Sequence, residues 1–265
     1  MFSRLIFAGG GARCAYQIGV WKALAEANYL SKITSVAGTS LGAFNAALFV
    51  QGDIEKAITA WMEMSRWTIA KIRLKSIIKT GTLCDKEGLR EFFERHICYQ
   101  SIFQSDTLLK ICCTDVSKVF PWTTRFCNGH QTSRLTFGAV SYYWDVKDMN
   151  EVDLIFALLA TCSLPIVYQP ENIHGKVLID GGFTCRTPLH AFGEINEEKT
   201  IVIHCDSFEK FRFNNSDNNT LHIFPRKYQG GVWTGTYDFV GKNIKKRISQ
   251  GYHETLDIIE KGRFI

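Results

Sequence analysis

Two glycine-rich turns near the N-terminus restrict the folds that this chain can adopt. The apolar segment Arg4–Phe7 leads into Gly9-Gly10-Gly11, and apolar residues then recur at helical spacing over Ala15–Ala27. The β-branched segment Ile33–Ala37 leads into Gly38-Thr39-Ser40-Leu41-Gly42, which opens a second apolar helix. Consecutive strand–turn–helix units predict an α/β fold, in which a mainly parallel sheet is covered by helices on both faces.

The rest of the chain continues the alternation of strands and helices. We predict helices over residues 41–50, 54–64, 88–97, 152–161 and 239–261, and strands over 108–116, 122–127, 176–179 and 200–205. No repeat or long linker divides the sequence, and 265 residues are near the upper size of one α/β domain. We therefore expect a single domain over residues 1–265.

Composition places the chain among ordinary globular proteins. Hydrophobic residues make up 46% and charged residues 22% of the sequence, and a net charge of +5 is too small to indicate nucleic-acid binding. The N-terminus lacks a secretory pattern. The nine cysteines form no C-x-x-C pair and no zinc-type spacing, so we predict reduced thiols, no metal site and a cytoplasmic protein.

Ser40 lies at the centre of a G-x-S-x-G turn between a predicted strand and a predicted helix. Such a turn exposes the serine hydroxyl at a sharp corner, and the N-terminus of the following helix favours a developing negative charge. The Gly9-Gly10-Gly11 turn would add N–H groups that converge on one oxygen, because no side chain stands in the way. A nucleophile beside an oxyanion-binding turn is the equipment for acyl transfer.

Both turns have simpler interpretations. A G-x-S-x-G turn also occurs where small residues pack a helix on a sheet. The glycine-rich turn partly matches a dinucleotide-binding fingerprint, but Cys14 occupies the third glycine position and no acidic residue ends the second strand. The sequence therefore disfavours nucleotide binding.

A serine nucleophile needs a base, and Asp180 is the best candidate. The seven histidines are scattered, and none lies in a recognisable catalytic context. Asp180 ends the short strand at 176–179 and is followed by Gly181-Gly182, which places it where ligands bind in open α/β sheets. A buried aspartate can accept the serine proton directly when burial raises its pKa.

Three ordered motifs resemble those of the patatin-like phospholipases, namely Gly9-Gly10-Gly11-Ala12-Arg13, Gly38-Thr39-Ser40-Leu41-Gly42 and Asp180-Gly181-Gly182. Further similarity comes from Ala160–Pro165, Thr187-Pro188 and Gly251-Tyr252. The resemblance therefore covers essentially the whole chain.

The resemblance implies a three-layer α/β/α sandwich and a Ser–Asp dyad that cleaves fatty acyl esters of phospholipids or neutral glycerolipids, without a metal or other cofactor. Ser40 would be the nucleophile and Asp180 the base. Backbone N–H groups of Gly9, Gly10, Gly11 and Ala12 would form the oxyanion hole. Arg13 would bind substrate or position the loop, and a structural salt bridge explains it equally well.

The chain also departs from the family pattern. Cys14 stands where the loop usually ends in glycine, and Cys185 and Arg186 stand where an Asn pair is common. We expect these differences to alter substrate preference and turnover rather than the basic chemistry.

A basic segment after the third helix suggests contact with a membrane surface. In a helix, Lys71, Lys75 and Lys79 would form one stripe suited to anionic headgroups, although a solvated basic face would look the same. Peripheral membrane association is therefore one expectation for this chain.

Two other functions stay open at this point. A Ser-His-Asp esterase could use His204 or His222 as its base, although such enzymes usually carry the serine turn later in the chain. A non-catalytic or regulatory lipid-binding protein could retain the fold without the activity.

Overall fold

The computed structural model describes residues 1–65, 82–118, 138–193, 198–213 and 219–262. Two predictions fall outside these ranges, namely the strand at 122–127 and the lysine stripe of Lys71, Lys75 and Lys79. Both stay predictions.

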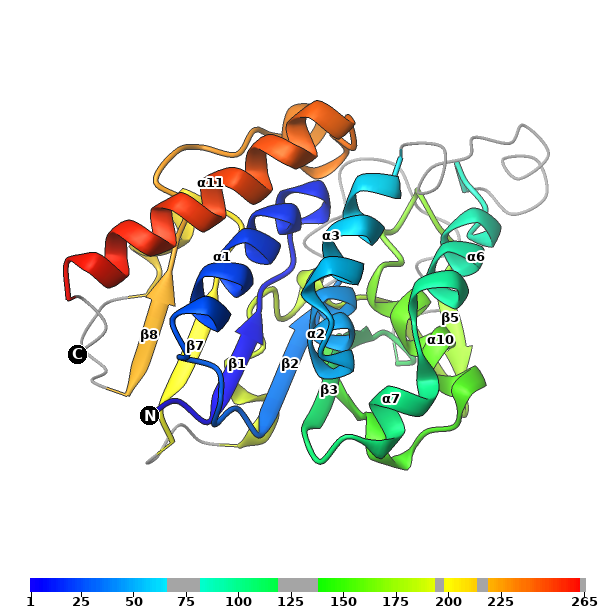
Figure 1. Cartoon of the computed structure of the whole chain (residues 1–265). Helices are drawn as coiled ribbons and strands as arrows, with labels where there is room; N and C mark the ends of the chain where they lie inside the picture. Colours follow the sequence, from blue (N-terminus) through cyan, green and yellow to red (C-terminus); the bar gives the residue numbers. More distant parts are fainter. Residues whose placement is uncertain (66–81, 119–137, 194–197, 214–218, 263–265) are drawn as a thin grey trace.

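Among the described residues, five parallel strands form the larger part of the sheet (Figure 1). In spatial order they are β8 (Thr220–Ile223), β7 (Thr200–Ile203), β1 (Arg4–Phe7), β2 (Ser35–Thr39) and β3 (Leu108–Asp115). Three further strands run antiparallel to their neighbours beyond β3, namely β4 (Val140–Asp145), β6 (Lys176–Asp180) and β5 (Glu171–Ile173).

The strand β3 brings the ends of β2 and β6 together. One edge of β3 pairs with β4 along Lys110–Asp115. The other edge is shared, because β2 pairs with Leu108–Cys112 and β6 with Cys113–Asp115. Since β2 runs parallel and β6 antiparallel to β3, their C-terminal ends meet, with Thr39 opposite Cys112 and Asp180 opposite Cys113. We expected Asp180 at the end of a parallel strand; it reaches the same place from the opposite direction.

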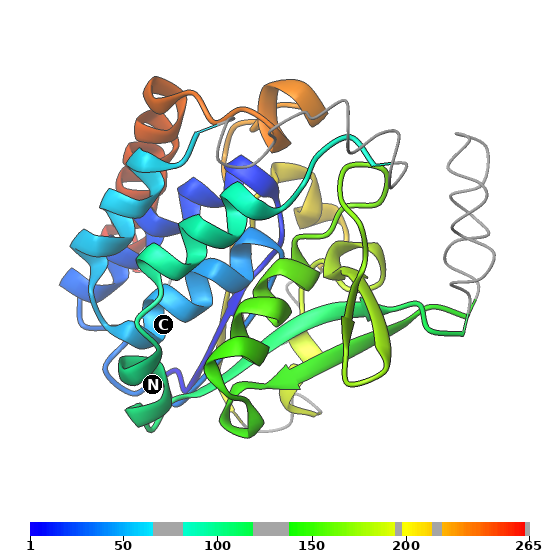
Figure 2. The same ribbon diagram turned by 90° about the vertical axis from the view of Figure 1, so that its right-hand side faces the viewer.

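The described α-helices lie together on one face of the sheet (Figure 2). They are α1 (Ala15–Glu26), α2 (Leu41–Gln51), α3 (Ile54–Glu63), α6 (Glu87–His96), α7 (Tyr99–Gln104), α10 (Glu151–Thr161) and α11 (Gly241–Glu260). The main core lies between these helices and the sheet, where Leu5 and Phe7 of β1 are fully buried. The alternate residue Ile6 faces the other side, where the short helix η4 (Leu189–Phe192) covers it.

The predicted α/β architecture, with a central sheet flanked by helices, is confirmed, and its two outer layers are unequal. Most predicted elements are present to within two or three residues of their expected ends. Sequence periodicity missed β4, β5, β8 and α7. β5 is three residues long, and β4 and β8 consist mostly of half-buried residues, so neither shows a buried–exposed alternation.

The last helix, α11, packs directly on α1. A Cβ atom added at Gly251 would lie 2.1 Å from the backbone oxygen of Tyr16, so the two helix backbones touch. Since α1 follows the Gly9–Gly11 turn, α11 holds the helix that supports this turn. None of the described helices is long and apolar enough to cross a membrane.

Candidate active site

Ser40 lies in a strained turn between β2 and α2. Its backbone has φ 54° and ψ −135°, a left-handed conformation that costs energy for a residue with a side chain. The Ser40 N–H donates to Thr161 Oγ1 at 2.8 Å, and the Thr161 hydroxyl donates in turn to the carbonyl of Cys112. The C-terminal end of α10 therefore holds the turn in place.

Asp180 contacts the Ser40 side chain directly. Ser40 Oγ donates to Asp180 Oδ2 at 2.8 Å, while the Gly182 N–H donates to Oδ1 at 2.8 Å. The Thr114 hydroxyl fixes the backbone carbonyl of Asp180 at 2.9 Å. The carboxylate is thus held from both sides, and one of its oxygens faces the serine.

Burial raises the pKa of Asp180 from 3.8 to about 6, although the hydrogen bonds from Gly182 and Ser40 and the charge of Arg186 oppose this shift. The side chain is only 4% exposed, so water does little to stabilise its charge. A carboxylate of raised pKa is a stronger base than an exposed aspartate. The pair therefore has the geometry and the proton affinity for direct transfer of the serine proton.

The Gly9–Gly11 turn opens a 3-10 helix, η1 (Gly11–Cys14), beside Ser40. Gly9 uses its N–H in a 2.8 Å bond to the carbonyl of Arg186. Gly10 is the N-cap and Gly11 the first residue of η1, positions at which the helix itself supplies no acceptor for the N–H group. Gly11 has φ +60°, and a Cβ atom there would lie 2.4 Å from the carbonyl oxygen of Thr236, so only glycine fits.

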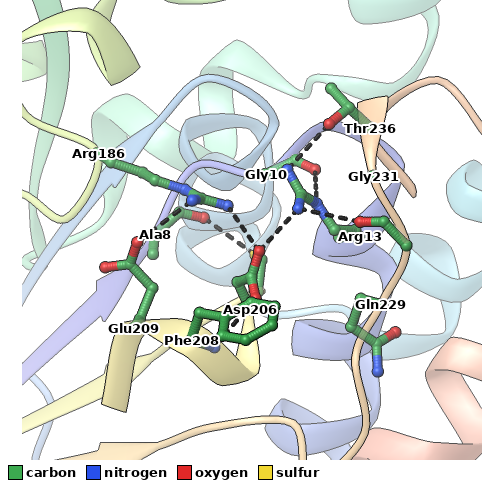
Figure 3. A network of polar contacts seen from close by, with 12 residues as sticks. Ala8, Gly10, Arg13, Arg186, Asp206, Phe208, Glu209, Gln229, Gly231 and Thr236 are labelled. Carbon is green, nitrogen blue, oxygen red and sulfur yellow. Dashed lines mark hydrogen bonds and ion pairs between the residues drawn. The ribbon is translucent and has the colours of Figure 1, made fainter. Parts of the chain in front are cut away.

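Two arginines hold the carbonyls of this turn, and Figure 3 shows the bond from Arg13 to Gly10 and the position of Asp206 between the two guanidinium groups. Arg13 Nε donates to Gly10 O at 3.1 Å, and Arg186 Nε donates to Gly9 O at 2.9 Å. Asp206 lies between the two guanidinium groups, 2.8 Å from Arg13 and 3.9 Å from Arg186. We call Arg13, Arg186 and Asp206 the arginine clamp.

The arginine clamp fixes the direction of the neighbouring N–H groups. In a trans peptide the C=O of one residue points opposite to the N–H of the next. Holding the carbonyls of Gly9 and Gly10 therefore directs the N–H groups of Gly10 and Gly11 away from the arginines. Both groups are therefore candidate donors to an oxyanion.

The remaining contacts of Arg13 are also with the protein. Its guanidinium donates to Thr236 Oγ1 at 2.9 Å and to Gly230 O at 3.4 Å. These bonds support the positioning role that the sequence left open. Binding of substrate by Arg13 stays a prediction.

A pocket of about 480 Å³ joins these elements. Its walls combine the polar groups of the site with apolar side chains, and its lining residues are Gly9, Gly10, Gly11, Arg13, Ser40, Leu164, Asp180, Gly182, Phe183, Arg186, Val232, Thr236 and Tyr237. A pocket of this size admits the ester end of a larger amphipathic molecule.

The two histidines considered as bases bind each other instead. His204 Nε2 lies 2.9 Å from His222 Nδ1, and the His204 ring stacks on Phe224. Burial, with the nearby charges of His222 and Arg186, lowers the pKa of His204 well below its usual value. Ser40 Oγ has the Asp180 carboxylate as its acceptor, so the geometry favours a dyad over a Ser-His-Asp triad.

Cys14 packs beneath the Gly9–Gly11 turn. It is fully buried, and its sulfur lies 3.3 Å from that of Cys205. Burial raises the pKa of the Cys14 thiol well above its usual value, which keeps it protonated and a poor nucleophile. Cys14 and Cys205 together fill the space under Gly10, where a glycine at position 14 would leave a gap.

Sequence reasoning missed Thr161 and Asp206 as parts of the site. Thr161 lies in the segment Ala160–Pro165. The similarity of this segment to the family did not indicate that Thr161 binds the backbone of Ser40. Asp206 follows β7 by three residues, so its place at the C-terminal edge of the sheet was a usable signal.

Comparisons with known proteins show the family and the fold of the chain. The family model described as "Patatin-like phospholipase" matches residues 5–192. The crystal structure of VipD from Legionella pneumophila is similar, with a TM-score of 0.56 and 12% identity over 98% of this chain and 67% of that chain. At this identity the likeness shows the fold alone.

The type III effector protein ExoU, from Pseudomonas aeruginosa, is also matched. Its TM-score is 0.46 at 14% identity, over 98% of this chain and 53% of that chain. The present chain thus spans about two thirds of the VipD chain and about half of the ExoU chain. No curated protein sequence matches the chain.

The pKa of Asp180 predicts how stability depends on pH. A pKa of about 6 in the folded state, against 3.8 normally, means that the ionised side chain destabilises the fold by about 3 kcal/mol relative to the protonated one. Asp180→Asn removes this charge and keeps an acceptor for the Gly182 N–H. Its free energy of unfolding should exceed that of the wild type at about pH 8, where Asp180 is ionised in both states.

The difference should shrink as the pH falls through 6 towards 4, because native Asp180 then takes up its proton. Urea unfolding of both proteins at about pH 8 and about pH 4.5 measures it. A difference that does not change with pH would contradict the buried charge.

Proposed function

Because the chain belongs to the patatin-like phospholipase family, and is therefore a lipid acyl hydrolase, we propose that Ser40 is its nucleophile and Asp180 its general base. The observation that carries this assignment is the 2.8 Å hydrogen bond from Ser40 Oγ to Asp180 Oδ2, made at a strained strand–helix turn. The substrates we propose are phospholipids or neutral glycerolipids.

The reaction proceeds in two halves. Ser40 Oγ attacks the ester carbonyl carbon while its proton passes to Asp180 Oδ2. The tetrahedral intermediate collapses, the alcohol leaves with the proton from Asp180, and an acyl-serine remains. Asp180 then takes a proton from water, whose oxygen attacks the acyl-serine. Collapse returns the proton to Ser40 and releases the fatty acid.

The N–H groups of Gly10 and Gly11 stabilise the oxyanion in this proposal. One such donor contributes about 3–4 kcal/mol to the transition state. Gly9, which we expected among the donors, instead binds the Arg186 carbonyl and serves to anchor the turn. The Ala12 N–H lies in the first turn of η1 and is a further candidate donor.

The apolar side of the pocket suits an acyl chain. Leu164 and Tyr237 line both the main pocket and a small adjoining cavity of about 30 Å³, whose lining also includes Ser40, Leu89 and Phe239. We propose that the acyl chain enters from this side. Arg13 could reach the polar headgroup only if it released a present partner.

We also propose a domain organisation and a cellular location for the protein. The family match ends at residue 192, but β7, β8 and α11 complete the same sheet and helix layer, which supports one domain over residues 1–265. We propose that the protein acts in the cytoplasm, where it binds the surface of a membrane to reach its substrate.

Ser40→Ala tests the proposal. The variant keeps the fold but lacks the nucleophile, so we expect loss of hydrolysis of a phospholipid panel and of labelling by a fluorophosphonate probe, which forms a covalent bond with activated serines. Liquid chromatography with mass spectrometry would identify the released fatty acid. Full hydrolysis by Ser40→Ala would overturn the assignment.

The arginine clamp predicts that Arg186 acts on turnover without touching the ester. Arg186→Ala frees the Gly9 carbonyl, so the Gly10 N–H loses its fixed direction. We expect kcat on a soluble ester to fall about tenfold to a hundredfold with little change in KM. Arg186→Lys should recover only part of the loss, because lysine cannot donate to Gly9 and to Glu209 in one fixed plane.

Arg212→Ala is the matched control. Arg212 lies 3.8 Å from the same Glu209 carboxylate, and it is Arg186 that donates to the Gly9 carbonyl, so the loss of Arg212 should leave kcat unchanged. Equal losses in the Arg186→Ala and Arg212→Ala variants would show that Glu209, rather than the turn, accounts for the effect.

A further inference from the structure

The exposed aromatic side chains of the described residues gather beside the pocket. Phe208, Phe211, Tyr228 and Trp233 are 60%, 77%, 57% and 77% exposed, and every exposed aromatic residue in the described ranges belongs to this group. Val232, 58% exposed, lies next to Trp233. We call these five residues the apolar rim.

Contacts connect the apolar rim to the pocket. Val232 lines the pocket itself, and the Trp233 ring lies 6.0 Å from that of Tyr237, which also lines it. Phe208 and Tyr228 pack edge to face at 5.4 Å. Phe208 lies in the first turn of the short helix η5 (Ser207–Phe211), where its N–H donates to the side chain of the N-cap residue Asp206, a member of the arginine clamp. The rim therefore adjoins the wall on which the clamp and the oxyanion turn are built.

The exposed charged side chains on the described segments that carry the apolar rim are all positive. In the described parts of residues 206–242, the exposed charged side chains are Lys210, Arg212, Arg226, Lys227 and Lys242. The acidic residues there, Asp206, Glu209 and Asp238, are each at most 7% exposed and are paired with arginines. Exposed aromatic side chains interleaved with lysine and arginine match a bilayer interface that carries negative headgroups.

We propose that the apolar rim and its flanking lysines dock the protein on an anionic lipid surface, with the pocket facing the bilayer. The aromatic side chains enter the boundary between headgroups and acyl chains, while Lys210 and Lys227 contact lipid phosphates. This proposal rests on the proposed function for its purpose, since docking would bring an ester bond to Ser40. It differs from the predicted stripe of Lys71, Lys75 and Lys79, which lies outside the described residues.

Vesicle binding tests the docking surface without depending on the chemistry. The Ser40→Ala protein, which cannot consume the lipid in our proposal, is floated with phosphatidylcholine vesicles with and without phosphatidylglycerol. We expect binding to be on the order of tenfold stronger when phosphatidylglycerol is present. Adding Phe211→Ser and Trp233→Ser together should weaken binding to the anionic vesicles by at least about tenfold.

Matched controls remove comparable groups elsewhere. Val152 is 59% exposed at the start of α10, about 14 Å along that helix from Thr161, so Val152→Ser should bind as well as the parent protein. Lys210→Gln with Lys227→Gln should weaken binding. Lys32→Gln with Lys199→Gln, which removes equal charge just before β2 and β7, should not.

The outcomes separate docking from catalysis. Rim variants that bind like the Val152→Ser control would overturn the proposal, as would a parent protein that binds neither vesicle; the latter result would point to a protein partner for the rim. In otherwise wild-type protein, Phe211→Ser with Trp233→Ser should reduce hydrolysis of vesicle phospholipid more than that of a water-soluble ester. Failure of Ser40 as the nucleophile would leave the binding result intact.

Discussion

The hydrogen bond between Ser40 and Asp180 depends on the way in which two strands share one edge of β3. β2 ends opposite Cys112, and β6 arrives from the other direction and ends opposite Cys113. The last residues of the two strands, Thr39 and Asp180, therefore lie close together, although they are far apart in the sequence. Sheet register, rather than a flexible loop, sets the distance between hydroxyl and carboxylate. Register is hard to change, because a slip of one residue would move every side chain of the strand to the opposite face of the sheet.

The surroundings of the pair reconcile two opposing electrostatic needs. Asp180 must be desolvated to keep a high affinity for a proton, whereas the glycine turn must stabilise negative charge. Arginine beside the turn would serve the second need and lower the pKa of Asp180. Asp206 of the arginine clamp and the neighbouring Glu209 reduce the effect of the arginines on the pKa of Asp180, because the two carboxylates neutralise the guanidinium groups. The effect of Arg186 on the pKa of Asp180 is accordingly smaller than that of burial. The arginines act on the turn through hydrogen bonds to Gly9 and Gly10 rather than through net charge.

Sequence analysis placed the candidate site residues most directly where local rules determine the backbone shape. A G-x-S-x-G turn has a fixed backbone shape, and apolar periodicity placed its strand and helix, so Ser40 could be identified without long-range information. Asp180 was found because a short strand ends in Asp-Gly-Gly, but the reason given for its position was incomplete. Strand direction beyond β3 depends on pairing between distant segments, which periodicity does not encode. The position of Asp206 after β7 was a usable signal, but its partners were not predictable, since Asp206 joins Arg13 and Arg186 only after β7 has paired with β1. The departures at Cys14 and Arg186 proved informative, because each has a supporting role that this fold explains.

The dependence of kcat/KM on pH, measured with a water-soluble ester, tests the central claim most directly. Activity should fall about tenfold per pH unit below an acid limb that reflects the pKa of Asp180, about 6, because the protonated carboxyl cannot accept the serine proton. The acid limb should persist unchanged in the His222→Gln variant, because the ring of the native His222 binds His204 rather than the serine. A limb that vanishes or moves in His222→Gln, or activity that stays constant down to about pH 4, would contradict a Ser40–Asp180 dyad.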